Sequence, residues 1–200
     1  MPGSLVVTDP RSHVRQRQII APGNAFVVRD FLSPEAVARW RARGEEAGYV
    51  ANAPISMAQG PTRDDSVRNN SRAMIDRPDW AEALWPQMAP LFEAIDGGEP
   101  VGVNERFRFY RYGAGQYFQP HYDGYFQRSA TERSLWTVLI YLDGACEGGA
   151  TVLFAHDHEV TPEAGLLLAF RHRQLHAGQE VVRGLKEVLR TDVMYRFPAV

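Results

Sequence analysis

Residues 119–124 read Gln-Pro-His-Tyr-Asp-Gly, so a single residue separates His121 from Asp123. In an extended chain the side chains of residues i and i+2 leave the same face, and these two would project together. An imidazole and a carboxylate are two of the three protein ligands in the facial triad of a non-haem Fe(II) site, which leaves other coordination positions open. A short H-x-D pair also arises often by chance, as a polar turn before a strand. A second histidine elsewhere in the chain must decide between these interpretations.

Four histidines in the C-terminal half could complete such a site. His156 and His158 lie in Ala-His-Asp-His-Glu, a polar segment typical of a turn between strands. His172 and His176 follow the apolar segment 165–170, which indicates that they lie near the end of a strand. Both are even-numbered, so periodicity does not separate them, and the choice of third ligand stays open on these grounds.

A site that used 2-oxoglutarate would also need a cation for the distal carboxylate of that acid, because a buried carboxylate without a partner is costly. Lys186 and Arg190 lie on the last expected strand at even spacing, hence on one face. Lysine offers a point charge, whereas arginine offers a bidentate fork. Val188 lies between them on the same face, which indicates that this face is not freely exposed. Either residue could serve.

The elements that must position these residues differ between the two halves of the chain. Residues 1–20 are polar and without period, and we expect a flexible N-terminal segment there. A short strand at 26–32 precedes a helix that Ser33 and Pro34 begin and Gly48 ends. A long polar loop is expected at 51–72, and a second helical region at 79–95.

Strands dominate the second half and are expected at 106–112, 135–142, 150–154, 165–170 and 187–197. Short strands separated by Gly-rich turns predict a sandwich or barrel rather than alternating strands and helices. The predicted fold class is therefore α+β, with a double-stranded β-helix (jelly-roll) core of antiparallel strands and N-terminal supporting helices. We expect one domain at 21–200, made of a helical preface at 21–100 and the jelly-roll core at 101–200.

Composition excludes several classes of function. The 200 residues are 44% hydrophobic and 23% charged, which suits a globular domain. A net charge of −2 offers no electrostatic footprint for nucleic acid or for a membrane surface. We find no apolar run that could span a bilayer and no signal peptide. Cys146 is the only cysteine, which excludes an intrachain disulfide and favours a reducing, cytoplasmic location. Oligomeric state is not readable from the sequence.

The order and spacing of the motifs resemble the Fe(II)- and 2-oxoglutarate-dependent dioxygenases of the prolyl 4-hydroxylase-like superfamily. The likeness covers roughly residues 104–197. Its motifs are the H-x-D pair, the distal histidine, the lysine ten residues after it, and the segments 112–123, 147–151, 160–165 and 184–195. The resemblance implies hydroxylation of an unactivated C–H bond in a small molecule or a peptidyl residue, with succinate and CO₂ as co-products.

The resemblance also implies roles for individual residues. It assigns His121, Asp123 and His176 to Fe(II), and it leaves His172 a supporting or surface role. The residues implied to bind 2-oxoglutarate are Lys186, with Arg190 as an alternative, Tyr112, with Tyr110 as a same-face alternative, and Thr151. The implied cofactors are Fe(II), 2-oxoglutarate as co-substrate and O₂. A need for ascorbate, which related prolyl hydroxylases use, stays open.

A small-molecule or peptide substrate is expected at the mouth of the barrel. The candidate contacts are Arg68, Asn69, Asn70 and Arg72 in the long loop, and Asn104, Arg106 and Arg108 near the entrance. Cations and amides in this number suit an anionic or peptide-like substrate, and residues 124–133 are a candidate lid. Two alternatives stand beside this hypothesis: a cupin-like metalloenzyme that uses no 2-oxoglutarate, and a binding module whose H-x-D pair is accidental.

Overall fold

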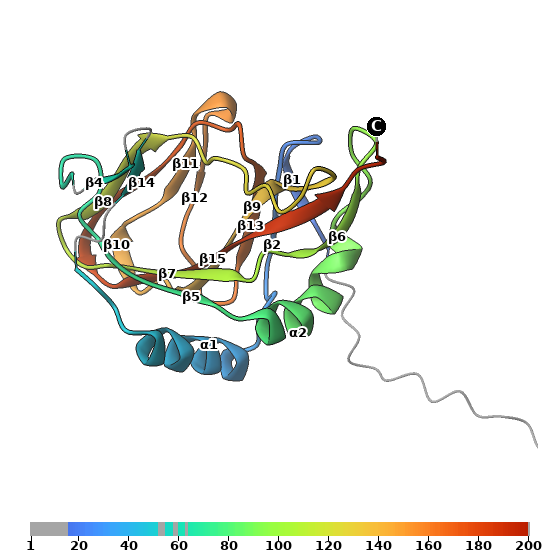
Figure 1. Cartoon of the computed structure of the whole chain (residues 1–200). Coiled ribbons are helices and arrows are strands. Elements are labelled where there is room, and N and C mark those ends of the chain that lie inside the picture. Colours follow the sequence, from blue (N-terminus) through green and yellow to red (C-terminus); the bar gives the residue numbers. More distant parts are fainter. Residues whose placement is uncertain (1–15, 52–54, 58–59, 63, 200) are drawn as a thin grey trace, which may run out of the picture.

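The computed structural model describes residues 16–51, 55–57, 60–62 and 64–199. Two β-sheets face each other, and helices α1 (Pro34–Ala47) and α2 (Pro78–Met88) lie beneath the larger sheet (Figure 1). All strand pairs in both sheets are antiparallel. The α+β class and the double-stranded β-helix are confirmed.

The larger sheet carries strands from both halves of the chain. Its order is β1 (Gln18–Ala21), β2 (Ala25–Val28), β13 (Leu167–Arg171), β9 (Glu132–Asp143), β15 (Lys186–Arg196), β7 (Arg106–Tyr112) and β5 (Ser71–Asp76), with β6 (Glu99–Val103) also paired to β15.

The smaller sheet closes the other side of the barrel. Its order is β10 (Cys146–Gly148), β14 (His176–Gly184), β11 (Thr151–Leu153) and β12 (His158–Val160), with β8 (Gln116–His121) also paired to β14. A separate hairpin joins β3 (Ile55–Met57) to β4 (Gly60–Thr62), and two short 3-10 helices are η1 (Ala89–Leu91) and η2 (Phe154–His156).

Helix α1 begins and ends where the sequence predicts. The Ser33 hydroxyl accepts a hydrogen bond from the Ala36 amide at 3.3 Å, and Pro34 occupies the first turn. Gly48 follows the last helical residue with a φ of +77°, a conformation that costs glycine little.

The alternation of β7 divides the interior into two cores. Phe107 and Phe109 point toward the helices, where they pack with Trp40 and Trp80, whose rings meet edge-on at 5.4 Å. Tyr110 and Tyr112 leave the opposite face and join the cluster between the two sheets. The helices therefore cover the outer face of the larger sheet, and its inner face is left for the site.

Three expectations about the N-terminal half need correction. Strand β1 begins at Gln18, inside the segment expected to be flexible, while residues 1–15 lie outside the described part. The expected loop at 51–72 contains the β3–β4 hairpin and the start of β5. Strands β2 and β5 pair with β13 and β7, so the helical preface is built into the main sheet rather than set before it. The physical reason is that β7 and β13 would otherwise expose unpaired edges. The helices of the described chain include none that is long and apolar enough to cross a membrane.

Candidate active site

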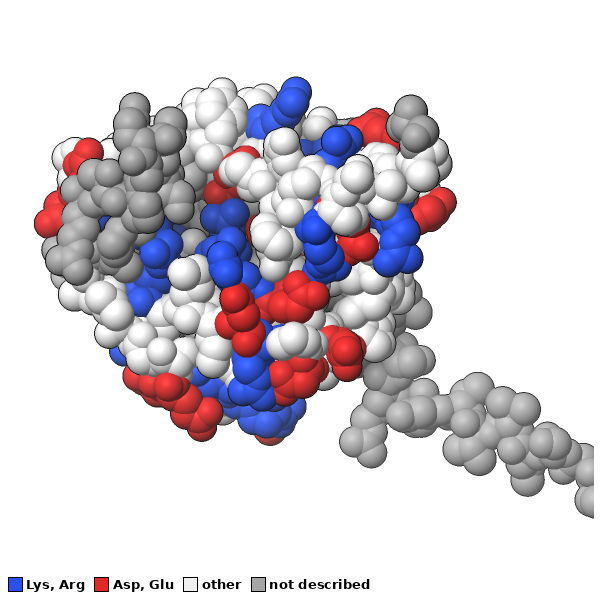
Figure 2. Space-filling model, in the orientation of Figure 1, with Lys and Arg blue, Asp and Glu red and all other residues white. Residues whose placement is uncertain are grey.

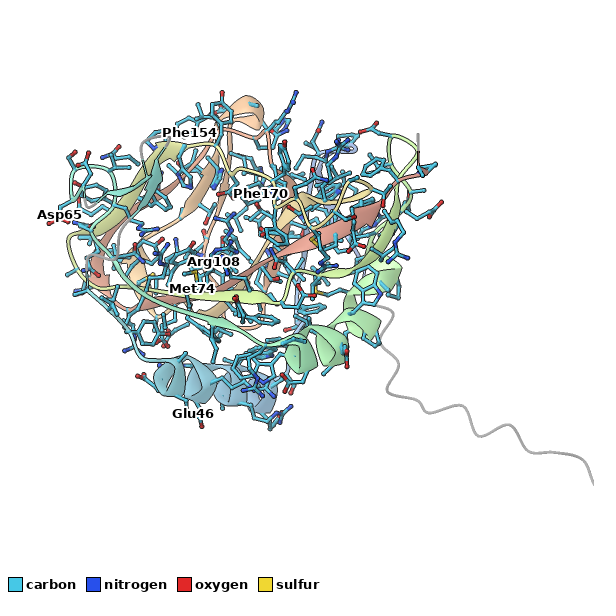
Figure 3. The ribbon with its side chains drawn as sticks, in the orientation of Figure 1. Glu46, Asp65, Met74, Arg108, Phe154 and Phe170 are labelled. Carbon is cyan, nitrogen blue, oxygen red and sulfur yellow. The ribbon has the colours of Figure 1, made fainter. Side chains whose placement is uncertain are left out.

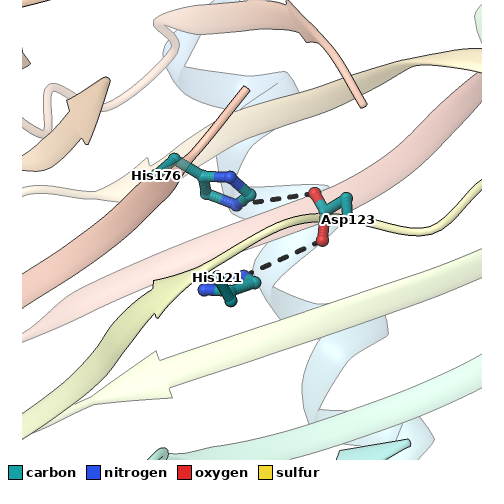
Figure 4. A group of neighbouring side chains, drawn as sticks. All are labelled: His121, Asp123 and His176. Atoms are coloured by element: carbon teal, nitrogen blue, oxygen red, sulfur yellow. Dashed lines mark ion pairs between the residues drawn. The ribbon is translucent and has the colours of Figure 1, made fainter. Parts of the chain in front are cut away.

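His121, Asp123 and His176 converge in the interior, as predicted (Figure 4). Strand β8 ends at His121 and β14 begins at His176, and the pairing of the two strands sets these residues directly opposite each other. One ligand atom from each of the three residues lies within 4.8 Å of the others. The Asp123 oxygens are 3.8 Å from His121 Nε2 and 3.5 Å from His176 Nε2. Within the described residues, His156 and His158 join no such group.

Backbone carbonyls fix which nitrogen each imidazole presents. Nδ1 of His121 lies 2.8 Å from the Gln119 carbonyl oxygen, and Nδ1 of His176 lies 3.0 Å from that of Gln174. Because a carbonyl only accepts, both Nδ1 atoms carry the proton. Each Nε2 is then unprotonated and faces Asp123. Its lone pair is free to coordinate a metal, as metal binding requires.

The charge state of the triad also suits a metal. Burial lowers the pKa of His121 to about 4 and lowers that of His176 below its ordinary value, so both rings are neutral near pH 7. Burial alone would raise the pKa of Asp123, but Arg190 and the two imidazoles outweigh it and hold this pKa below its usual range. Two neutral imidazoles and one carboxylate are the donor set of non-haem Fe(II) oxygenases, so the residues fit Fe(II).

Asp123 is held at both oxygens. Arg190 places a guanidinium nitrogen 2.7 Å from Oδ1, and the Thr137 hydroxyl donates to Oδ2 at 2.7 Å. Arg190 also lies 3.4 Å from Asp192 and hydrogen-bonds with the Tyr110 hydroxyl. Arg190 is therefore committed to acidic and phenolic partners of the chain itself.

The triad opens into a partly enclosed cavity whose empty space, with the open mouth included, is about 400 Å³. All five residues predicted to bind 2-oxoglutarate line this cavity: Tyr110, Tyr112, Thr151, Lys186 and Arg190. The cavity therefore lies against the triad and carries the predicted cations.

Lys186 is a buried cation without a carboxylate partner among the described residues. Its side chain is 2% exposed, its Nζ donates to the Gly149 carbonyl oxygen at 2.6 Å, and it lies 5.0 Å from the centre of the Tyr112 ring. Burial lowers its pKa to about 8. Since a buried charge needs a counter-ion, this end of the cavity fits the carboxylate of a dicarboxylic acid such as 2-oxoglutarate.

The Gly-Gly pair before Thr151 explains how Lys186 is received. Gly148 and Gly149 have φ values of +75° and +71°, which side chains rarely adopt. A Cβ at Gly149 would lie 3.0 Å from a Val181 methyl and 3.4 Å from the Lys186 stem. Glycine lets the turn aim its carbonyl at Nζ without crowding the lysine.

Of the four substrate contacts predicted in the long loop, two are buried. Arg68 is 4% exposed, with its guanidinium 5.2 Å from the Phe118 ring centre, and Asn70 is 0% exposed and donates to the Ser71 carbonyl. Arg72 lies on β5 opposite Tyr110. Arg106 is exposed and makes a two-pronged ion pair with Asp76, both contacts at 2.8 Å.

The other predicted contacts are also partly engaged. Asn69 donates to the Gly115 carbonyl and accepts from the Tyr117 amide, and Asn104 donates to Asp192 at 3.3 Å. Arg108 lies 3.4 Å from Asp192, on the side of β7 away from the helices (Figure 3). Arginine side chains gather in and around a hollow in the face shown in Figure 2.

Sequence reasoning missed three buried polar residues next to the site, namely Ser134, Thr137 and Tyr141, and left His172 a supporting or surface role. Tyr141 donates to Thr151 at 2.7 Å, while Ser134, Thr137 and His172 form hydrogen bonds that lead to Asp123. A signal was present: the segment 135–142 is almost continuously apolar, and Thr137 interrupts it. A hydroxyl in a buried strand needs a partner, which points to a polar neighbour inside the barrel.

Residues 107–191 match the family model of the 2OG-Fe(II) oxygenase superfamily. A search of curated proteins gave no match. The solved structures that match include a viral collagen prolyl hydroxylase from Paramecium bursaria Chlorella virus-1 in a 2OG complex, with a TM-score of 0.60 and 19% identity over 86% of this chain and 96% of that chain.

Two further matches are a prolyl-4-hydroxylase from Pseudomonas putida and a prolyl hydroxylase from Trichoplax adhaerens. The first has a TM-score of 0.63 and 18% identity over 88% of this chain and 94% of that one. The second, in complex with a hypoxia inducible factor peptide fragment, has a TM-score of 0.64 and 14% identity over 85% of this chain and 83% of that one. At these identities the likeness shows a shared fold.

The family match spans the H-x-D pair, the distal histidine and the buried lysine, and it favours an enzyme dependent on 2-oxoglutarate over the cupin-like alternative. Together with the converging triad and the shared fold, it identifies residues 107–191 as a 2OG-Fe(II) oxygenase domain and the protein as a non-haem dioxygenase that uses Fe(II), 2-oxoglutarate and O₂.

Proposed function

We propose that this dioxygenase hydroxylates an anionic small molecule or short peptide, with Lys186 as the anchor for 2-oxoglutarate. The observation that carries the co-substrate assignment is a buried ammonium without a carboxylate partner, in the described chain, at the end of the cavity that the triad opens into. Arg190 is the weaker candidate because Asp123 and Asp192 already engage its guanidinium.

In this proposal His121, Asp123 and His176 hold Fe(II). When bound, Fe(II), 2-oxoglutarate and O₂ supply oxidative decarboxylation to succinate and CO₂, coupled to hydroxylation of a C–H bond. The chain supplies position, charge and dryness. Lys186 orients the distal carboxylate, the Thr151 hydroxyl accepts from Tyr141 and keeps its own proton for the same carboxylate, and apolar residues such as Leu139 limit water.

Anaerobic titration tests the assignment of the site. Wild-type protein that receives Fe(II) and then 2-oxoglutarate should develop the weak visible charge-transfer band of a chelated complex, and His121→Ala should not. Identical spectra for the two proteins would overturn the ligand assignment.

The affinity for 2-oxoglutarate should depend on pH through Lys186. Burial lowers the pKa of this lysine to about 8, and only its protonated form attracts a carboxylate. The value of kcat/KM for 2-oxoglutarate should therefore fall as pH rises through about 8. Lys186→Arg stays charged at these pH values, so its fall should shift to higher pH. Coincident profiles for the two proteins would contradict the assignment.

The substrate class follows from guanidinium groups beside the cavity. Arg72 of β5 pairs with Tyr110 of β7. On the other edge of β7, Arg108 pairs with Arg190 of β15. Burial lowers the pKa of Arg72, the Tyr110 hydroxyl, its hydrogen-bond partner, raises it, and the positive charges of Arg68 and Arg108 lower it again. An anionic substrate group near this cluster would relieve that repulsion, so we infer a carboxylate on the prime substrate.

Paired compounds provide the test. Free amino acids and short peptides should stimulate succinate formation when they carry a free carboxylate, and their carboxamides should not. With the best substrate, Arg72→Gln should raise its KM by at least about tenfold, the expected cost of losing a charged hydrogen bond, while the KM for 2-oxoglutarate stays unchanged. Arg106→Gln is the matched control, because Arg106 is an exposed arginine that pairs with Asp76 at the surface. Equal stimulation by acids and amides would refute an anionic substrate.

Several narrower expectations belong to the proposal. The peptide in the Trichoplax structure supports a peptidyl target beside a small-molecule one. Ascorbate dependence, a cytoplasmic location and the lack of nucleic-acid or membrane partners stay predictions from the sequence, as does a single domain over 21–200.

A further inference from the structure

A chain of buried hydrogen bonds lies behind Asp123 on the side away from Arg190. The Thr137 hydroxyl lies 2.7 Å from Asp123 Oδ2 and 3.0 Å from His172 Nδ1. The Ser134 hydroxyl lies 2.8 Å from His172 Nε2 and accepts from the Phe126 amide at 2.8 Å. We propose that His172 is a positioning residue that fixes the Asp123 carboxylate through Thr137, an inference that rests on the proposed role of Asp123 as a metal ligand.

The partners determine the direction of every hydrogen bond in this chain. Asp123 is ionised and can only accept, so the Thr137 hydroxyl donates its proton to Asp123. Thr137 must then accept from His172, which places a proton on Nδ1. Burial lowers the pKa of His172, so the ring is neutral and its Nε2 accepts from the Ser134 hydroxyl. One tautomer satisfies all the groups.

The residues in this series of hydrogen bonds are buried, and their surroundings keep them rigid. Ser134 and Thr137 are both 0% exposed on β9, and His172 is 5% exposed, with its backbone amide bonded to the Leu135 carbonyl at 3.1 Å. Protein groups make every hydrogen bond from the Phe126 amide to Asp123, so no water is needed to connect them. A side chain that is buried and fully hydrogen-bonded has one orientation, and it passes that orientation to its partner.

The two carboxylate oxygens of Asp123 are held by different kinds of group. Arg190 holds Oδ1 by charge, and Thr137 holds Oδ2 by a directed hydroxyl. Together they fix the plane of the carboxylate relative to the two Nε2 atoms. Without His172, the Thr137 hydroxyl would lose the donor that directs it, and the carboxylate could rotate away from the metal-binding geometry.

Amide substitutions separate the two nitrogens of His172. The amide nitrogen of His172→Asn can take the place of Nδ1 and donate to Thr137, whereas His172→Gln places its amide nearer the position of Nε2, and His172→Leu provides neither. His158→Leu, in an exposed position on β12, is the matched control. Thr137→Val and Thr137→Ser test the hydroxyl in the same way.

The readout is the Kd for Mn(II), a redox-inert stand-in for Fe(II), measured calorimetrically on the full chain without 2-oxoglutarate. Thr137→Val and His172→Leu should each raise Kd by about 10- to 100-fold, the usual effect of losing a partner of a metal ligand. The double variant of Thr137→Val and His172→Leu should bind Mn(II) no more weakly than the weaker-binding single variant. Both changes break the same series of hydrogen bonds. Thr137→Ser, His172→Asn and His158→Leu should stay within about threefold of wild type.

The possible outcomes distinguish this inference from the proposed function. Wild type that fails to bind Mn(II) would refute the ligand assignment itself. Normal wild-type binding with unchanged Kd in Thr137→Val and His172→Leu would refute the positioning role. If His172→Leu does not fold, equal Kd values for His172→Asn and His172→Gln would refute it instead, and a tighter value for His172→Asn would support it.

Discussion

Asp123→Asn is expected to abolish turnover and also to destabilise the metal-free protein, a combination not expected of the histidine ligands. The carboxylate is the counter-ion of Arg190, whose side chain is 12% exposed and 2.7 Å away. An amide leaves that guanidinium buried and uncompensated, which typically costs roughly 3–5 kcal/mol of unfolding free energy. The lower end is expected because Asp192 remains 3.4 Å from Arg190.

His121→Gln is the matched comparison. It should also abolish turnover, because it removes a proposed neutral ligand of Fe(II), but it leaves the Arg190–Asp123 pair in place. Its free energy of unfolding should therefore stay within about 1 kcal/mol of wild type, the scale of losing one neutral hydrogen bond. Urea unfolding of the metal-free proteins at neutral pH measures both values. If the two variants were equally stable, the ion pair would not contribute as the structure indicates.

Strand periodicity accounts for what could be predicted about the site. His121 and Asp123 face one point because they are two residues apart, and Lys186, Val188 and Arg190 all line one cavity because they alternate along β15. These relations are local and need only the geometry of an extended chain. The family resemblance supplied the pairing with the distal histidine, which the register of β8 and β14 confirms.

Relations that depend on pairing between distant strands could not be predicted in this way. Arg68 and Asn70 come from a segment rich in turn-forming residues, and their burial depends on how that segment packs against β7 and β8. The contact of Thr137 with His172 depends on the register of β9 against β13. The commitment of Arg190 to Asp123 is likewise a tertiary contact, and it is what separates Arg190 from Lys186 as a co-substrate anchor.

Lys186→Met is expected to separate function from stability. In the wild-type protein without ligands, the ammonium has only the Gly149 carbonyl as a hydrogen-bond partner among the described residues. A methionine of similar length removes this buried charge, and such replacements are often neutral or stabilising, here by about 1–2 kcal/mol. The same change leaves the distal carboxylate of 2-oxoglutarate buried without a cation. The KM for 2-oxoglutarate should therefore rise by roughly 10²- to 10³-fold, while the Kd for Mn(II) stays unchanged.

The pH dependence of unfolding provides the sharper test of this trade-off. Burial lowers the pKa of Lys186 from 10.5 to about 8, so between these values the unfolded wild-type chain binds more protons than the folded one. Wild-type stability should rise with pH across that window, by linkage, and Lys186→Met should lack this contribution. The free energy of unfolding of Lys186→Met should exceed that of wild type by the largest amount below pH 8, and the difference should vanish toward pH 10.5. Urea unfolding at pH 7 and pH 9.5 measures the difference, with Lys186→Arg as the variant that keeps the charge. An advantage of the methionine variant that is the same at both pH values would show that the ammonium is not what destabilises the empty site, and the reason for expecting a carboxylate there would be lost.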